Sequence, residues 1–225
     1  NDDIMVDKIE QIPHELQPGR LDVIRLAQIT DCHIFADPLG CLLGLNTRDS
    51  FEAVCERLMR EEWRPDALLA TGDLSQDASP QAYKYLADYF KSMNIPSFWL
   101  AGNHDDSDTM ELYLSNSQVF AAKQILLGRW QVLMLNSAVK GKVHGCLAAD
   151  QIRFLKRALK RYPDKFTLIC LHHQPVEVGC EWLDQIGLFN ADEFIKIVEQ
   201  HEQVKGVLWG HIHQEFTRKI KGVQW

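Results

Sequence analysis

The residues best suited to chemistry form five short polar motifs, and each motif follows an apolar run typical of a β-strand. Carboxylate, amide and imidazole groups are costly at the edge of a core unless they bind something. These ligand types suit a pair of divalent transition metal ions. Because the carboxyl ends of parallel strands meet at one edge of a sheet, where ligands usually bind, we expect the motifs to converge. They are Asp31-Cys32-His33, Gly72-Asp73, Gly102-Asn103-His104-Asp105, His172-His173 and Gly210-His211-Ile212-His213.

Taken singly, each motif has an ordinary explanation. Asp31 could be a helix cap, His33 a surface histidine, and Gly72-Asp73 a common turn pair; Asn103 could also be a turn residue. The joint interpretation is favoured because the ordinary explanation would have to hold independently at five strand ends.

The spacing within the motifs also fits a shared site. Asp31 and His33 are two residues apart, as are His211 and His213, so each pair can face one side of a strand end. The carboxylate of Asp73 has two oxygens and can bridge two cations.

Alternating strands and helices must position these motifs. A helix is expected to begin at Asn46 or Thr47 and to bury Phe51, Val54, Leu58 and Met59, which recur at helical spacing. A second begins at Ser79-Pro80, a cap residue followed by a proline suited to the first turn. Others are expected over residues 149–162 and over 191–201, where Asn190 would be the cap. The expected strands are residues 23–30, 67–71, 97–101, 131–135, 167–171 and 204–209.

This alternation predicts an α/β fold in which helices cover a mostly parallel sheet. At 225 residues the chain can form one large domain, which we expect over residues 22–225. Residues 1–21 are charged, contain Pro13 and Pro18, and are predicted to form a loosely held arm. A hairpin turn is expected at Lys221-Gly222, with a strand that the chain interrupts, so we expect a truncated C-terminus.

Composition narrows the range of partners. The net charge of −7 argues against nucleic acid and anionic membranes, although bound metal ions would still allow a phosphate substrate. No signal peptide or membrane-spanning stretch is expected. The six cysteines include no C-x-x-C pair, so we predict mostly buried thiols, such as Cys55 and Cys170, and a cytoplasmic location. A monomer or a homodimer is expected.

The order D-x-H, G-D, G-N-H-D, H-H and G-H-x-H resembles the calcineurin-like metallophosphoesterases, from about Leu21 to about Glu215. The resemblance implies a four-layer αββα sandwich, with two mixed β-sheets flanked by helices. It also implies two divalent metal ions, most often iron or manganese, with zinc or cobalt as alternatives. Either His172 or His173 could be the ligand in the double-histidine motif, and His172 is favoured. The implied ligands are Asp31, His33, Asp73 and His213 for one metal, and Asp73, Asn103, His172 and His211 for the other.

Further segments resemble the bacterial class III 3′,5′-cyclic-AMP phosphodiesterases. That resemblance implies a small-molecule substrate, cyclic AMP, opened to 5′-AMP by a hydroxide that the metal pair supplies. His104 and Asn103 would be catalytic, and these two with His33 and His213 would contact the substrate. Asp105 would orient His104 by a hydrogen bond. The segments are 42–47 (LLGLNT), 70–77 (ATGDLSQD), 182–185 (WLDQ) and 210–215 (GHIHQE).

The nucleobase would need a pocket outside the metal centre. Asn46, His144 and Trp182 are possible contacts, but each has an alternative, as a helix cap, a loop histidine and a packing residue respectively.

Two other functions remain open. The chain could be a different metallophosphoesterase, such as a phosphomonoesterase or a glycerophosphodiesterase-like enzyme. It could also be a non-enzymatic scaffold, since a fold alone does not establish catalysis. A scaffold would be expected to have lost ligands, whereas this chain retains a full set.

Overall fold

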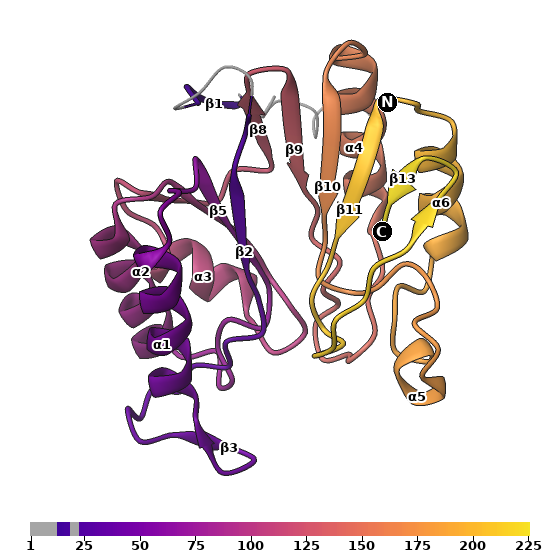
Figure 1. Cartoon of the computed structure of the whole chain (residues 1–225). Coiled ribbons are helices and arrows are strands. Elements are labelled where there is room, and N and C mark those ends of the chain that lie inside the picture. The colour runs from indigo at the N-terminus through magenta and orange to yellow at the C-terminus, as the bar shows by residue number, and fades with distance from the viewer. Residues whose placement is uncertain (1–12, 19–22) are drawn as a thin grey trace, which may run out of the picture.

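The structure, a computed structural model, describes residues 13–18 and 23–225. Two large β-sheets pack face to face, and helices cover the outer face of each, as Figure 1 shows. The expected four-layer sandwich is therefore confirmed.

The smaller sheet is entirely parallel among the described residues. Each of its strands returns through a helix, and such a crossover joins neighbouring strands in the same direction. The prediction of two mixed sheets is therefore wrong for this sheet. Its strands, in spatial order, are β2 (Leu26–Ile29), β5 (Ala67–Thr71), β6 (Ser97–Leu100) and β7 (Val119–Phe120).

The larger sheet is mixed, as expected. The β8–β9 pair and the β12–β13 pair are antiparallel, and the other neighbours are parallel. In spatial order its strands are β1 (His14–Leu16), β8 (Gln124–Leu127), β9 (Trp130–Met134), β10 (Phe166–Cys170), β11 (Val204–Leu208), β13 (Val223–Gln224) and β12 (Lys219–Ile220).

Helices fill the two outer layers. The smaller sheet is covered by α1 (Thr47–Arg60), α2 (Pro80–Met93) and α3 (Ser107–Tyr113). The larger sheet is covered by α4 (Ala149–Arg161) and α6 (Ala191–Glu199). Two small elements project from the lower end of the view in Figure 1: the hairpin of β3 (Cys41–Leu42) and β4 (Leu45–Asn46), and the short helix α5 (Glu181–Asp184).

Strand β5 shows how the layers hold together. All five of its residues are buried, and their side chains alternate between two cores. Leu68 and Ala70 pack under the helices, whereas Ala67 and Leu69 pack between the sheets against residues such as Val132 of β9. A strand buried on both faces must be continuously apolar, and the sequence ALLAT satisfies that requirement.

The helix starts follow the local sequence signals. The side chain of Asn46 accepts a hydrogen bond from the Asp49 amide, and Ser79 does the same for the Ala82 amide. The predicted apolar stripe of α1 is partly wrong, because Val54 and Met59 are 56% and 41% exposed. Phe51 of that stripe is buried and Leu58 is partly buried, and Cys55, outside the predicted stripe, is buried as well.

Helix α6 departs from its prediction at both ends. The Asn190 side chain makes no capping hydrogen bond, because it pairs in both directions with the backbone of Leu147, at 2.9 Å each way. The helix ends at Glu199 rather than at residue 201, and the His201 ring lies 2.7 Å from the carbonyl of Ile197. The His201 side chain thus occupies a carbonyl that would accept from a backbone amide if the helix continued.

The N-terminal arm is more ordered than predicted over part of its length. β1 pairs in parallel with β8, and the ring of His14 packs on Phe98 and Phe120. The rest of the predicted arm, residues 1–12 and 19–21, lies outside the described residues. The first strand of the smaller sheet is shorter than predicted, since β2 spans only Leu26–Ile29.

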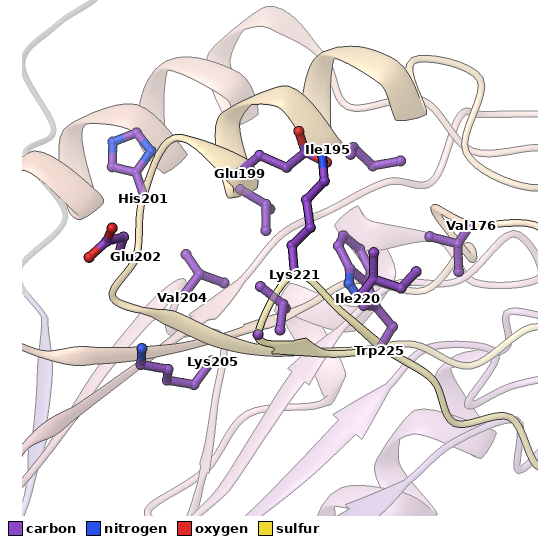
Figure 2. Close-up of a pocket in the computed structure, with 13 residues that line it drawn as sticks. Val176, Ile195, Glu199, His201, Glu202, Val204, Lys205, Ile220, Lys221 and Trp225 are labelled. Carbon is purple, nitrogen blue, oxygen red and sulfur yellow. The ribbon is translucent and has the colours of Figure 1, made fainter.

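At the other end of the chain, the predicted hairpin turn is confirmed. Lys221 and Gly222 join β12 to β13 with positive φ angles of 49° and 85°. A cavity of about 350 Å³ lies between this hairpin and α6, lined by Ile195, Ile220 and Trp225 among others (Figure 2). None of the polar motif residues lines it, so the chemistry must be sought elsewhere.

Candidate metal centre

The five polar motifs gather where the carboxyl ends of the two sheets meet. Asp31, Asp73 and Asn103 follow β2, β5 and β6 of the smaller sheet. His172 and His211 follow β10 and β11 of the larger sheet.

Hydrogen bonds across the seam tie the two sheets together. The His211 amide donates to both carboxylate oxygens of Asp31, at 3.1 and 3.0 Å. His172 Nδ1 lies 2.8 Å from the carbonyl oxygen of Thr71. The convergence predicted from the sequence is therefore confirmed by the geometry.

One group of ligand atoms surrounds the side chain of His33. Its Nε2 lies 3.1 Å from His213 Nε2, and 3.9 Å from both Asp31 Oδ1 and Asp73 Oδ2. His213 Nε2 is also 3.1 Å from Asp31 Oδ1. These four side chains can surround a single cation. His213 is half exposed, so this side of the centre opens to solvent.

A second group adjoins the first through Asp73. Asp73 Oδ2 lies 3.3 Å from His172 Nε2. The ring centroids of His172 and His211 are 5.1 Å apart. The side-chain oxygen of Asn103 is buried, and the backbone amide of its neighbour His104 donates to Asp73 Oδ1 at 2.8 Å. Asp73 therefore lies between both groups, as a bridging ligand must.

Buried polar atoms without partners test whether these residues fit a metal. Among the described residues, Asn103 Oδ1, His172 Nε2 and His211 Nε2 are buried and make no hydrogen bond. An unpaired buried polar atom costs free energy. His172 is the clearest case: its Nδ1 donates to the Thr71 carbonyl, so its other nitrogen presents a lone pair to the Asp73 carboxylate. A cation resolves that contact, and the donor set fits a divalent metal.

Most of the proposed ligands have a positive backbone φ angle. Positive φ is uncommon outside glycine and costs free energy unless the surroundings impose it. Such strain, where observed, points to a functional constraint. The site residues concerned are Asp31 (54°), His33 (48°), Asp73 (48°), His211 (69°) and His213 (49°).

Two glycines allow the loops to approach this closely. Gly72 has a φ of +94°, and a Cβ there would lie 2.5 Å from His172 Nδ1. A Cβ on Gly210 would overlap Thr30 Oγ1 and lie 2.5 Å from Asp31 Oδ2. Any larger residue would push the two sheet edges apart.

The electrostatics couple carboxylates to imidazoles. Burial alone would raise the pKa of Asp73, but the imidazole of His172, 3.3 Å away, and its positive charge hold that pKa below its usual range. Burial alone would lower the pKa of His172, yet Asp73 raises it to about 9. Without a metal, a proton on His172 would thus balance the Asp73 carboxylate. The site favours positive charge at this position.

The pKa shifts of the other imidazoles at the site depend on how deeply each ring is buried. Burial lowers the pKa of His211 to about 4 and also lowers that of His33. The hydrogen bond to Asp31 raises the pKa of the half-exposed His213. Neutral imidazoles are the form that binds metal ions.

Of the two adjacent histidines, only His172 has a free nitrogen. His173 Nδ1 lies 2.8 Å from Ser137 Oγ, and its Nε2 lies 3.1 Å from the carbonyl of Val143. The ring of His173 is close enough to His172 and His211 to form a third metal-like cluster. Because both of its nitrogens already have partners, we favour His172 as the ligand.

The predicted hydrogen bond from Asp105 to His104 is wrong. The Asp105 carboxylate instead accepts hydrogen bonds from the backbone amides of Leu74, Ser75 and Gly102, and from the Tyr83 hydroxyl. The exposed ring of His104 lies beside His33, with the ring centroids 5.0 Å apart.

The possible nucleobase contacts are not brought together by any hydrogen bond or ring contact. Both polar ends of the Asn46 amide are used locally, for the helix cap and for the Pro38 carbonyl. His144 stacks on Phe189 at 3.6 Å. Trp182 is 63% exposed, so the alternative of a packing residue is wrong.

Some supporting residues gave little signal in the sequence. Tyr83 is one of the buried residues of α2, and Ser137 lies shortly after β9. A hydroxyl near the end of a strand or on a helix is common, so neither position stands out. All six cysteines are free thiols, as predicted, but only Cys55 and Cys170 are buried.

Among the described residues, no helix has the length and apolar character needed to cross a membrane.

Curated relatives are similar over most of the chain. The 3′,5′-cyclic adenosine monophosphate phosphodiesterase CpdA of Haemophilus influenzae is 42% identical over 203 residues, which are 90% of this chain and 74% of that protein. The 3′,5′-cyclic-nucleotide phosphodiesterase of a Nostoc species is 43% identical over 204 residues, 90% of this chain and 76% of that protein.

A solved structure shares the fold at low sequence identity. A dimetal phosphatase from Danio rerio superposes with a TM-score of 0.67 at 14% identity, covering 90% of this chain and 86% of that one. The model of the calcineurin-like phosphoesterase family matches residues 24–215, which contain all five polar motifs. The chain therefore belongs to the calcineurin-like phosphoesterase family.

Proposed function

We propose that this protein is a metal-dependent phosphodiesterase that hydrolyses 3′,5′-cyclic AMP to 5′-AMP. The observation that carries the proposal is the pair of ligand groups that meet at Asp73 with buried, unpaired metal-binding atoms. Relatives about 42% identical bear the name of this activity, which supports the choice of substrate.

The ligands divide between two divalent metal ions. We assign Asp31, His33, Asp73 and His213 to the first ion. The second would be held by Asp73, Asn103, His172 and His211. Nitrogen and oxygen ligands of this kind accept iron, manganese, zinc or cobalt. We propose iron or manganese.

The chemistry needs few protein groups. A metal pair of this kind supplies a nucleophile at neutral pH and neutralises charge on the phosphoryl oxygens. Asp73 holds both halves of the site in register. The exposed His104 and the neighbouring Asn103 would contact the phosphate, with His33 and His213 bordering the open side. We assign to His104 the protonation of the departing 3′ oxygen as the ring opens.

A substrate panel tests the proposal. Hydrolysis of cyclic AMP, cyclic GMP, p-nitrophenyl phosphate and bis(p-nitrophenyl) phosphate would be measured with iron or manganese, with Asp73→Ala as the inactive control. We expect cyclic AMP to give 5′-AMP, by chromatography, with the highest kcat/KM of the panel. Rapid monoester hydrolysis without turnover of cyclic AMP would favour another phosphoesterase, and no turnover of any ester would favour a scaffold.

The role of His104 gives a sharper test. His104→Ala should keep the metal content of the wild type, because no ligand is lost. It should lower kcat by roughly 100- to 10,000-fold, the usual contribution of a positioned acid. An unchanged kcat would remove His104 from the mechanism.

Partners and location remain proposals. We propose a small-molecule substrate and no nucleic acid, in line with the net charge of −7. The free thiols are consistent with a reducing cytoplasm. A monomer or a homodimer is compatible with everything described above.

A further inference from the structure

Four hydrogen-bond donors converge on the carboxylate of Asp105. Oδ1 accepts from the Ser75 amide at 3.0 Å and from the Tyr83 hydroxyl at 2.9 Å. Oδ2 accepts from the Leu74 amide at 3.1 Å and from the Gly102 amide at 2.9 Å. Both oxygens of this side chain are therefore fully engaged inside the protein.

The donors belong to the two loops that carry proposed metal ligands. Leu74 and Ser75 directly follow Asp73, and Gly102 directly precedes Asn103. Tyr83 adds helix α2 to the same cluster, and its oxygen also accepts a hydrogen bond from the Asp106 amide at 3.1 Å. Asp105 thus links the end of β5, the end of β6 and helix α2.

The relative position of these two loops matters for the metal ligands. A Cβ on Gly102 would overlap Asp73 Oδ1, so the loops are already in contact. The His104 amide orients the Asp73 carboxylate from the second loop. A small shift of one loop would therefore change the distance between the Asp73 and Asn103 side chains.

A side chain with two accepting oxygens satisfies this arrangement. A carboxylate presents two oxygens with room for all four donors. An asparagine of the same shape would turn an NH₂ group towards two of the donors, so at least one backbone N–H group would lose its acceptor. The arrangement therefore requires two accepting oxygens at position 105, as well as a side chain of this size.

We infer that Asp105 is a positioning residue, which with Tyr83 sets the geometry of Asp73 and Asn103 and so the affinity for the second metal ion. The inference rests on the proposed metal centre. Partners behind the ligands of a metal site commonly change its affinity 10- to 100-fold when they are lost.

The test measures metal binding directly, without substrate. Chelator-treated wild-type protein would be titrated with Mn²⁺ by calorimetry, and bound metal counted by elemental analysis, for Asp105→Asn and Tyr83→Phe. Asp106→Asn is the matched control: it changes the neighbouring carboxylate, whose oxygen caps α3 by accepting hydrogen bonds from Thr109. It keeps the backbone amide that donates to Tyr83.

We expect Asp105→Asn to weaken the second Mn²⁺ by about 10- to 100-fold. Tyr83→Phe should weaken it less, because three donors remain, and Asp106→Asn should bind like the wild type. Excess Mn²⁺ should restore most of the kcat of Asp105→Asn, since no ligand or catalytic group has been removed.

The results separate this inference from the proposed function. Wild-type affinity at both sites in a folded Asp105→Asn protein, even one with a lower melting temperature, would overturn the positioning role. If that variant did not fold by circular dichroism, Tyr83→Phe would decide, and wild-type affinity there would overturn it too. Two bound Mn²⁺ without turnover of cyclic AMP would refute only the proposed substrate.

Discussion

Histidine side chains at this centre differ in whether their second ring nitrogen has a hydrogen-bond partner in the protein. His172 and His173 are adjacent in sequence and both fully buried. Only one ring nitrogen of His172 has a hydrogen-bond partner in the protein, whereas both ring nitrogens of His173 have one. This difference predicts different behaviour on substitution. His172 should matter for metal binding, and His173 for stability.

The pH dependence of stability should report on His173. Burial lowers the pKa of this imidazole to about 2 in the folded protein, whereas the ordinary value is 6.5. Below pH 6.5 the imidazole is therefore protonated in the unfolded chain but stays neutral in the folded protein. The free energy of unfolding consequently falls as the pH falls from 7 to 5. The contribution has an upper limit of about 1.4 kcal/mol per pH unit.

Urea unfolding of the wild type and of His173→Gln, measured at several pH values in this window, isolates the effect. The glutamine does not titrate, so its stability curve should be flatter than that of the wild type. Parallel curves for the two proteins would show that His173 is not held neutral by the fold.

At the scale of elements, sharp turns after the strands carry the ligands, and caps fix the helices that follow. Asn46 begins α1 and lies in the segment that resembles the cyclic-AMP phosphodiesterases. Its amide is fully used by the Asp49 amide and the Pro38 carbonyl. We therefore interpret this residue as a cap rather than as a contact for the nucleobase.

Asn46→Ala should lower the free energy of unfolding by about 1 kcal/mol, the usual value of a lost cap. Asn46→Asp keeps the accepting oxygen and should retain most of that stability. The kcat/KM of a folded variant should stay at the wild-type value for both cyclic AMP and bis(p-nitrophenyl) phosphate. A higher KM for cyclic AMP alone would show that Asn46 contacts the base after all.

At the scale of the whole molecule, the proposed ligands come from both sheets, so metal binding should hold the two halves together. Ligands that bind only the folded state stabilise it by an amount set by their concentration relative to Kd. At a hundredfold excess over Kd, each ion should contribute about 2.7 kcal/mol. Removing the metals should therefore lower the melting temperature.

Calorimetry with and without a chelator checks this expectation. Asp73→Ala lacks the bridging carboxylate, so the chelator should barely change its melting temperature. Asp106→Asn should respond like the wild type. If the chelator did not change the melting temperature of the wild type, the centre would not bind metal in the folded state.

Local signals in the sequence were enough for much of the architecture. The buried run ALLAT of β5, the Ser79-Pro80 start of α2 and the Lys221-Gly222 turn are each determined by neighbouring residues, and the structure has them where predicted. Short strands such as β7 and β8 went unrecognised, because two to four apolar residues carry too little periodicity. The cap predicted at Asn190 failed because Leu147, distant in sequence, takes its side chain.

By itself, the sequence determined which residues could bind metal and that each would follow a strand, because ligand chemistry and strand patterns are local properties. Only the tertiary structure decided which atoms remain free. The Thr71 carbonyl that turns His172 towards Asp73 is 101 residues away, and the loops that Asp105 joins are about 30 residues apart. Such partners are chosen by how the two sheets pack, which no short stretch of sequence encodes.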